Sequence, residues 1–230
     1  MVGIAKRRGT PAALEPSARL GRASGRGPAA GTRAKRSAER RDAILAAALD
    51  EFAERGFAAT RLEDVARRAD VAKGTIYLHF ADKEALFEEL IRMELSPVVA
   101  ALENVSHAEI PFRMITNQLI EVFAREIFET RRKDVIRLVI TEGPRFPKLA
   151  EFYYREVISR VMETIRAMLR RAYERGELKT DVLVRFPQLL AAPGIIAIIW
   201  SGLFDRFEPL DVRALMRAHF DVLLGSGDAA

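Results

Sequence analysis

The sequence predicts an all-α protein of about nine helices, in which a helix-turn-helix head is followed by a larger helical domain. Three observations predict this fold class. Apolar residues recur at helical spacing through most of the 230 residues. The stretch 60–83 has the pattern of two short helices joined by a tight turn. No segment alternates apolar and polar residues in the way that a β-strand requires.

Length and composition narrow the class of protein. A chain of 230 residues suits one or two domains and can bury a sizeable core. The absence of Cys excludes disulfides and thiolate chemistry, and it fits a reducing cytoplasm, where we expect the protein to act. The net charge of +5 is unevenly distributed, because residues 1–41 contain 11 Lys and Arg against two acidic residues. The basic character therefore belongs to the N-terminal region and is no argument for a basic globular surface.

Residues 1–36 are rich in Gly, Pro, Ala, Ser and Arg and contain few large apolar side chains. Such a segment cannot bury enough surface to offset its ordering entropy, so we predict a disordered basic tail. It serves either as an arm that adds affinity for DNA phosphates or as a passive extension. A secretory signal is not expected, because no apolar core follows the charged residues.

Residues 37–83 form the predicted head. A first helix from Ser37 to Arg55 has an apolar face that begins at Ile44 and Leu45. Thr60, followed three residues later by Glu63, predicts a capping box at the start of the next helix. The predicted turn falls at Asp70, a residue type that tolerates left-handed backbone. The apolar residues expected to pack this head are Leu62, Val65, Ala66, Ala69, Val71, Ile76 and Phe80.

The second short helix leaves one face exposed after its apolar residues have been assigned to the core. That face offers hydrogen-bond donors, one small residue that permits close approach, and rings with polar tips. Its residues are Lys73, Gly74, Thr75, Tyr77, Leu78 and His79. A helix of this composition after a tight turn is typical of a recognition helix that binds DNA.

These residues resemble the DNA-binding head of TetR/AcrR-type transcriptional regulators. The family has Gly-Phe at the end of its first helix, as Gly56-Phe57 here, and then a Thr that opens helix two. The further matches are Gly74, Thr75, Ile76, Tyr77, His79, Phe80, Asp82, Lys83, Glu84 and Leu86. One departure is Asp70, where the family often has Gly.

The resemblance implies a function and a set of contacts. Family members are sequence-specific DNA-binding transcriptional regulators, most often dimeric repressors released from a palindromic operator by a small-molecule effector. In the family's docking, base edges would meet Lys73, Gly74, Tyr77 and Leu78. Phosphates would meet Thr60, Thr75, Tyr77, His79 and Lys83.

Residues 84–230 are predicted to form a helical effector-binding and dimerisation domain. Its first helix is expected to be capped by Asp82 and to continue from the head to Pro97, where a kink or break is expected. Helices are then expected over 108–129, over 134–142, from 147 to about 175 with a stop at Gly176, over 186–204 and over 211–224. The stretch 137–157 resembles the C-terminal domain of AefR-type members of the same family.

The segment 186–204 has no charged residue, and its length approaches the roughly 20 residues that a membrane span needs. Pro187, Pro193 and Gly194 interrupt it, so a membrane span is not favoured. We expect a helix buried between its own domain and a partner subunit. The resemblance implies that the last two helices form the homodimer interface.

The family commonly binds a small molecule among the middle helices, and the resemblance therefore implies a small apolar or amphipathic effector here. The candidate contact residues are Phe112, Phe123, Phe128, Tyr153, Met162 and Trp200. Aromatic residues at helical spacing are also typical of an ordinary core, so this alternative stays open. Asn117, Gln118 or Glu121 are polar candidates for orienting a ligand.

Motifs of catalysis are missing from the sequence, which contains no GxSxG, P-loop or HExxH pattern. The three His residues lie on three different predicted segments, so we expect no enzyme activity, no metal and no cofactor. Two other interpretations of the function remain. One is a helical small-molecule-binding protein or enzyme on the same scaffold without specific DNA readout, and the other is a nucleoid-type protein driven by the basic tail. An activator rather than a repressor is also open.

Overall fold

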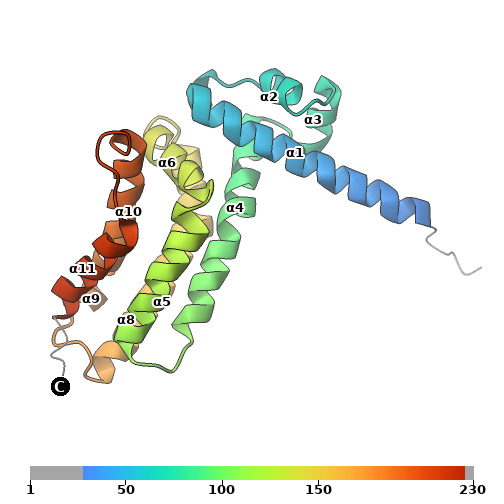
Figure 1. The fold of residues 1–230 in the computed structure, drawn as a ribbon. Coiled ribbons are helices and arrows are strands. Elements are labelled where there is room, and N and C mark those ends of the chain that lie inside the picture. The colour runs from blue at the N-terminus through green and yellow to red at the C-terminus, as the bar shows by residue number, and fades with distance from the viewer. Residues whose placement is uncertain (1–27, 226–230) are drawn as a thin grey trace, which may run out of the picture. The chain divides into compact units, whose positions relative to one another are not determined.

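A computed structural model describes residues 28–225, and within this range the regular secondary structure is all helical, without a β-strand (Figure 1). The all-α prediction is confirmed. Two π-helical segments, η1 and η2, continue the helices beside them, and with these merged the described range has ten helices against the predicted nine or so. The additional helix is the four-residue α9 (Val182–Arg185).

The first helix, α1 (Pro28–Ala59), begins earlier than predicted. Residues 28–36, assigned to a disordered tail from composition, are helical, whereas residues 1–27 of that tail lie outside the described residues. The helical geometry is interrupted at Gly56, with φ 75° and ψ 163°, which agrees with the predicted end at Arg55. Glycine suits this position because a side chain is strained at positive φ.

The head consists of the second half of α1 together with α2 (Leu62–Arg68) and α3 (Lys73–His79). Its centre is a trio of rings, which come from α1, from the residue that follows Gly56 and from α4 (Lys83–Ser106). Phe52, Phe57 and Phe87 lie with centroids 5.3–5.4 Å apart, and all three are fully buried. Edge and tilted ring contacts of this kind stabilise a core beyond their buried area. The predicted core residues Leu62, Val65, Ala66, Ile76 and Phe80 are buried as expected.

The helix that leaves the head, α4 (Lys83–Ser106), begins at the predicted cap, where the Asp82 carboxylate accepts a hydrogen bond of 2.7 Å from the backbone N–H of Ala85. The predicted break at Pro97 is wrong, because the helix runs through it. Pro97 is exposed, while Leu95 and Val99 on either side are buried. The free energy gained by burying this apolar face offsets the cost of the one backbone hydrogen bond that the proline removes.

The middle of the chain differs from the prediction in detail. The helix expected from residue 108 begins only at Phe112, as α5 (Phe112–Val122), because Pro111 precedes it, and it continues as η1 (Phe123–Phe128). After α6 (Arg132–Glu142) comes a long helix made of α7 (Pro147–Tyr153), η2 (Tyr154–Ile158) and α8 (Ser159–Glu174). It ends at Glu174, just before Gly176, which has φ 75° and where the sequence predicts a stop.

The last two helices, α10 (Gln188–Leu203) and α11 (Val212–Leu224), pack against each other. Buried apolar residues form two clusters: the first joins the head mainly to α4, α6 and α7, and the second joins α5 to α8–α11. Phe123 and Val161 contact both clusters. Among the described helices, none has the length and apolar character that crossing a membrane requires.

Candidate nucleic-acid interface

The α3 helix turns a mixed polar and apolar face outward. Ile76 and Phe80 anchor it, with 0% and 4% of their surface exposed, whereas Tyr77 and Leu78 are 47% and 85% exposed. Lys73 and Gly74 are also exposed, and Thr75 and His79 are half-buried. A methyl group built at Gly74 would meet no atom within 4 Å, so the α3 backbone is open at this point. Such a face can bring donors, a ring and an apolar group to the edges of base pairs.

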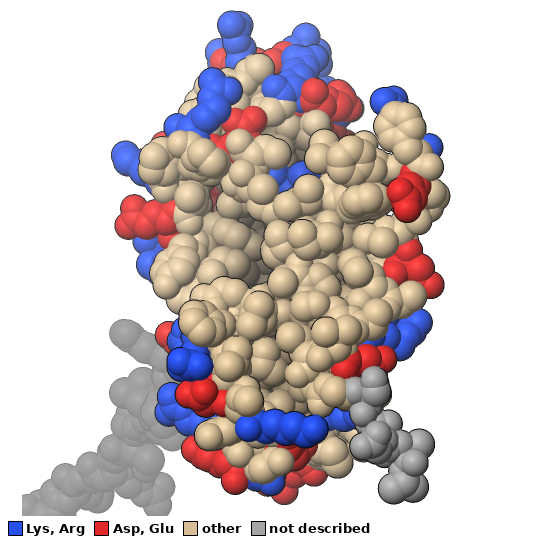
Figure 2. All heavy atoms as spheres, turned by 90° about the vertical axis from the view of Figure 1, so that its left-hand side faces the viewer, with Lys and Arg blue, Asp and Glu red and all other residues tan. Residues whose placement is uncertain are grey.

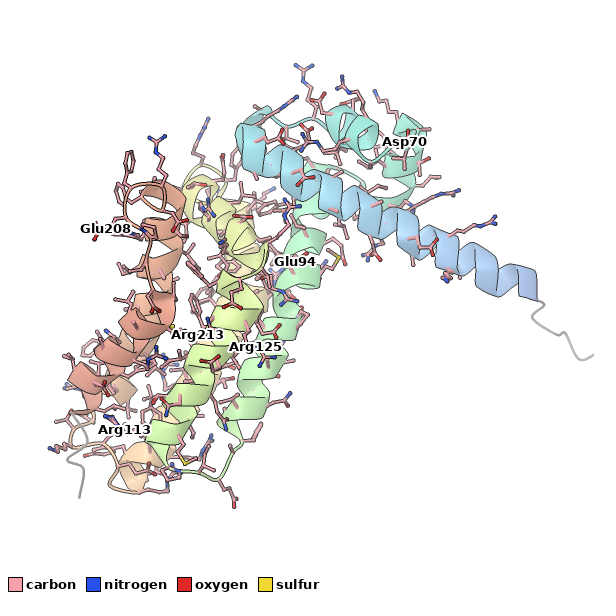
Figure 3. The ribbon with its side chains drawn as sticks, in the orientation of Figure 1. Asp70, Glu94, Arg113, Arg125, Glu208 and Arg213 are labelled. Carbon is pink, nitrogen blue, oxygen red and sulfur yellow. The ribbon has the colours of Figure 1, made fainter. Side chains whose placement is uncertain are left out.

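The turn between α2 and α3 has the conformation that the sequence predicts. Asp70 adopts φ 53°, the only non-glycine residue with positive φ among those described (Figure 3). The N–H of Val71 donates to the carbonyl of Ala66 at 3.0 Å, which closes the end of α2. Asp therefore replaces the Gly usual in the family, because a short polar side chain tolerates left-handed backbone.

Lys73, at the start of α3, forms an ion pair with Glu63 of α2, with 2.7 Å between Nζ and Oε1. The hydrogen bond from Lys73 lowers the pKa of the Glu63 carboxyl and raises that of Lys73. Both side chains are well exposed, so the pair contributes little stability. Lys73 can therefore leave Glu63 for a base or a phosphate at small cost.

Thr60 requires a correction. No side chain caps α2, whose N-cap residue is Arg61, and the predicted capping box is absent. The Thr60 hydroxyl instead donates to the carbonyls of Gly56, at 2.8 Å, and Glu51, at 3.1 Å. Since only 2% of Thr60 is exposed, its hydroxyl is bound within the end of α1.

Lys83 is also bound by the protein itself. Its ammonium donates to the carbonyls of Phe57, Ala58 and Thr60 at 2.6, 3.1 and 3.0 Å, and it lies 4.6 Å from the centre of the Phe57 ring. Burial lowers the pKa of Lys83. With three donors bound to three carbonyls, Lys83 closes the segment between α1 and α2 and has none left for a phosphate.

Arg61 is a basic residue that was not among the predicted site residues. It is exposed at the start of α2, and its charge helps to lower the pKa of Glu63, which also pairs with Lys73. Arg61 and Lys73 thus both contribute positive charge near Glu63. In the sequence, the one indication of a DNA contact was that Arg61 follows Thr60. An arginine at this position is equally typical of an ordinary solvated surface.

The head is attached to α6 near both ends of that helix. Arg131, just before α6, pairs with Asp50 of α1 at 2.5 Å. Glu142, the last residue of α6, accepts a hydrogen bond of 3.2 Å from the N–H of Phe57. The rings of Phe57 and Phe146 also meet edge to face, with 4.8 Å between centroids.

The structure does not bring the six predicted effector residues together around a described cavity. Phe112 is buried in the second cluster, and Phe123, Phe128 and Met162 are partly buried against it. Tyr153 packs on the first cluster, and burial raises the pKa of its hydroxyl to about 12.

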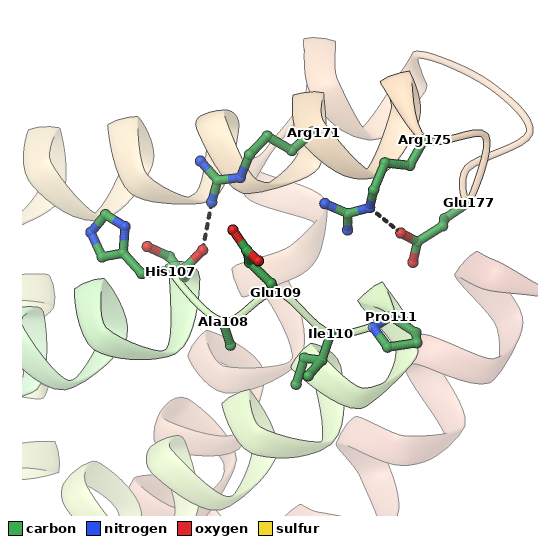
Figure 4. A pocket seen from close by; sticks show the side chains of 9 residues that line it. His107, Ala108, Glu109, Ile110, Pro111, Arg171, Arg175 and Glu177 are labelled. Carbon is green, nitrogen blue, oxygen red and sulfur yellow. Dashed lines mark hydrogen bonds and ion pairs between the residues drawn. The ribbon is translucent and has the colours of Figure 1, made fainter.

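Two of these six residues have partners on or beside α10. The Trp200 indole N–H donates to the carbonyl of Glu208 at 2.8 Å. Gly194 accommodates the Phe123 ring, since a methyl group there would lie 2.7 Å from Phe123 Cε2. A hollow of about 670 Å³ is lined by other residues (Figure 4).

These features define a class of protein: a helical regulator with a helix-turn-helix head whose second helix is exposed for duplex DNA. Residues 44–90 match the family profile of bacterial regulatory proteins of the tetR family, and residues 117–219 match the profile of the Tetracyclin repressor-like C-terminal domain. The chain belongs to the TetR family of DNA-binding transcriptional regulators.

Two relatives illustrate this membership. The HTH-type transcriptional repressor BepR of Brucella suis biovar 1 (strain 1330) is 30% identical over 151 residues, which cover 63% of this chain and 71% of BepR. The HTH-type transcriptional regulator AcrR of Shigella flexneri is 26% identical over 191 residues, or 81% of this chain and 88% of AcrR.

Solved structures share the fold. NalD of Pseudomonas aeruginosa, a secondary repressor of the MexAB-OprM multidrug efflux pump, has a TM-score of 0.66 at 21% identity, with 83% of this chain and 99% of NalD covered. FadR of Bacillus subtilis, solved in complex with stearoyl-CoA, has a TM-score of 0.65 at 20% identity, with 80% and 97% covered.

Proposed function

We propose that this regulator is a homodimeric repressor that binds a palindromic operator through α3 and leaves it when a small molecule binds. The observation that carries the proposal is the outward face of α3, held in place by buried Ile76 and Phe80. Residues 37–83 are the DNA-binding unit in this proposal, and residues 84–230 bind the effector and form the dimer. It acts in the cytoplasm, where its DNA is.

Lys73, Gly74, Tyr77 and Leu78 would meet base edges, and four residues, Tyr77 among them, would contact phosphates. Lys73 would donate to guanine O6 or N7, and Leu78 would contact a thymine methyl, while Gly74 lets the backbone approach the duplex. The phosphate contacts we propose are Thr75, Tyr77 through its hydroxyl, and His79. Arg61 is added to this set in place of Thr60 and Lys83, whose donors bind protein carbonyls.

Dimerisation through α10 and α11 is supported by the apolar face that these helices leave uncovered. Figure 2 shows a broad area without charged side chains, bordered by charged residues above and below. The exposed large apolar residues of α10 and α11 are Leu189, Ile195, Ile196, Ile199, Leu203 and Val222. An apolar area of this kind on a soluble regulator is typical of an interface, and a second copy buries it symmetrically.

Release by an effector follows from the connections of α6. This helix packs on the dimerisation helix α10 and is bonded to α1 through Arg131 and Glu142. An effector that shifts α6 therefore changes how the two heads are set for successive major grooves, about 34 Å apart. A coupling of about 1–3 kcal/mol changes operator affinity by about 5–150-fold. The complexes of FadR with stearoyl-CoA and of SmeT with triclosan support an apolar or amphipathic effector.

The direct test is a gel-shift titration on the promoter region beside the protein's own gene. We expect a specific complex with the wild-type protein and its loss with Tyr77→Ala. Leu189→Asn, on the proposed dimer face, should weaken the complex without changing the preferred sequence. Equal affinity of the wild-type protein for promoter and random duplex would contradict the proposal.

A further inference from the structure

A hollow of about 670 Å³ lies where the loop between α4 and α5 meets the C-terminal part of α8 (Figure 4). Small-molecule sites commonly have volumes of roughly 300–1,000 Å³. The loop contributes His107, Glu109, Ile110 and Pro111, and α8 contributes Arg171 with the adjoining Arg175. The 24 residues of α4, about 36 Å of helix, separate this hollow from the head.

The charged groups that line the hollow differ in how many hydrogen-bond and ion-pair partners they have. Glu177 accepts hydrogen bonds from the backbone N–H of Phe112 and from Nε of Arg175, so it is fully engaged. Arg171 uses one nitrogen on the carbonyl of Ser106, at 2.5 Å. Within residues 34–225, neither Arg171 nor Glu109 has an ion-pair partner. The terminal nitrogens of Arg175 likewise lack a hydrogen-bond partner in that range.

We propose that this hollow binds a small amphipathic anion, whose carboxylate or phosphate group lies between Arg171 and Arg175. A guanidinium group presents several N–H donors in a planar fork that matches either kind of anion. The guanidinium groups of Arg171 and Arg175 lie one helical turn apart on the same wall, so both can donate to one anion. Ile110 and Pro111 from the loop provide an apolar wall for the rest of the ligand. This site is separate from the effector residues proposed above and does not depend on them.

Glu109 gives the proposal its sharpest consequence. In Figure 4 its carboxylate points toward the space between Arg171 and Arg175 without pairing with either. A bound anion would be repelled by this charge, whereas a bound cation would be attracted by it. Removal of the Glu109 charge must therefore strengthen binding of an anion, which is the opposite of what loss of an ordinary structural contact does.

The test is calorimetric titration of the full chain, without DNA, with hexanoate, hexyl phosphate, hexanol and hexylammonium. We expect binding of at least one of the two anions and none of hexanol or hexylammonium. The better of the two anions identifies the group as carboxylate or phosphate. Arg171→Gln should weaken binding about tenfold, and Arg171→Lys should weaken it less. Glu109→Gln should strengthen it about threefold.

Arg166→Gln is the matched control, because Arg166 is exposed on the same helix but does not line the hollow. It should leave binding unchanged, and thermal melting of each variant reports whether its fold is intact. The proposal is overturned if hexanol or hexylammonium binds as well as the anions. It is also overturned if Arg171→Gln melts like the wild type and binds equally well, or if Glu109→Gln weakens binding.

Discussion

Lys73 and Lys83 show how position decides the role of a side chain. Both lie at the first residue of a helix, and both match what a DNA-binding head would use. Lys73 is exposed, and Glu63 is its one ion-pair partner among residues 34–225. Lys83 donates to three carbonyls at the end of α1, where the aligned backbone dipoles favour a positive charge. One lysine is therefore free for DNA, and the other stabilises the head that presents it.

Replacing Lys83 should therefore affect stability, and replacing Tyr77 should affect DNA binding. Lys83→Ala removes hydrogen bonds from a charged donor to three carbonyls, so we expect a loss of about 1.5–3 kcal/mol in the free energy of unfolding. Tyr77→Ala should change this free energy by less than about 0.5 kcal/mol and weaken operator binding at least tenfold, or about 1.4 kcal/mol. Urea denaturation and gel-shift titration measure the two quantities. The reverse pattern would refute both assignments.

Gly74 separates the requirements of folding from those of DNA binding. No atom lies within 4 Å of a methyl group placed there, and alanine favours helix more than glycine does. Gly74→Ala should therefore keep the stability or raise it by up to about 1 kcal/mol. Operator affinity should fall about tenfold, because the methyl group would lie between the α3 backbone and the duplex. Unchanged affinity would mean that this part of α3 does not approach DNA.

At the scale of the element, the sequence predicts local features better than distant contacts. The left-handed Asp70, the Asp82 cap and the stop at Gly176 all depend on neighbours in the chain, and all three predictions are confirmed. The hydrogen bonds of Thr60 and Lys83 could not be predicted from local sequence, because their partners are carbonyls 4 to 26 residues earlier in the chain. Similarly, α4 continues through Pro97 because of tertiary packing, which no local rule for proline includes.

The junction of α1 with α6 can be tested with a pair of glycines. Gly56 and Gly176 both have φ 75°, but only Gly56 faces another element, since a methyl group there would lie 2.7 Å from Oε1 of Glu142. Gly176→Ala should cost about 1–2 kcal/mol of unfolding free energy from the backbone alone. Gly56→Ala should cost more, and the excess measures the contact with Glu142. Equal losses in thermal or urea unfolding would show that the contact contributes nothing.

At the scale of the whole molecule, the account requires two copies acting together. Ile196, 53% exposed on α10, lies on the proposed dimer face, and Tyr154, 62% exposed on η2, lies outside it. Ile196→Lys should give a folded monomer because burying an unpaired charge in an apolar interface is unfavourable. Tyr154→Lys should remain dimeric. Sedimentation equilibrium distinguishes the two, and a monomeric wild-type protein at micromolar concentration would exclude the proposed interface.

The measurement that tests the central claim most directly is selection of bound duplexes from a random pool, at about 0.15 M salt so that non-specific phosphate binding is limited. The account predicts enrichment of an inverted repeat, with half-sites one helical turn apart, and loss of that enrichment in Tyr77→Ala. Recovery of sequences without a common motif by the folded wild-type protein would contradict it.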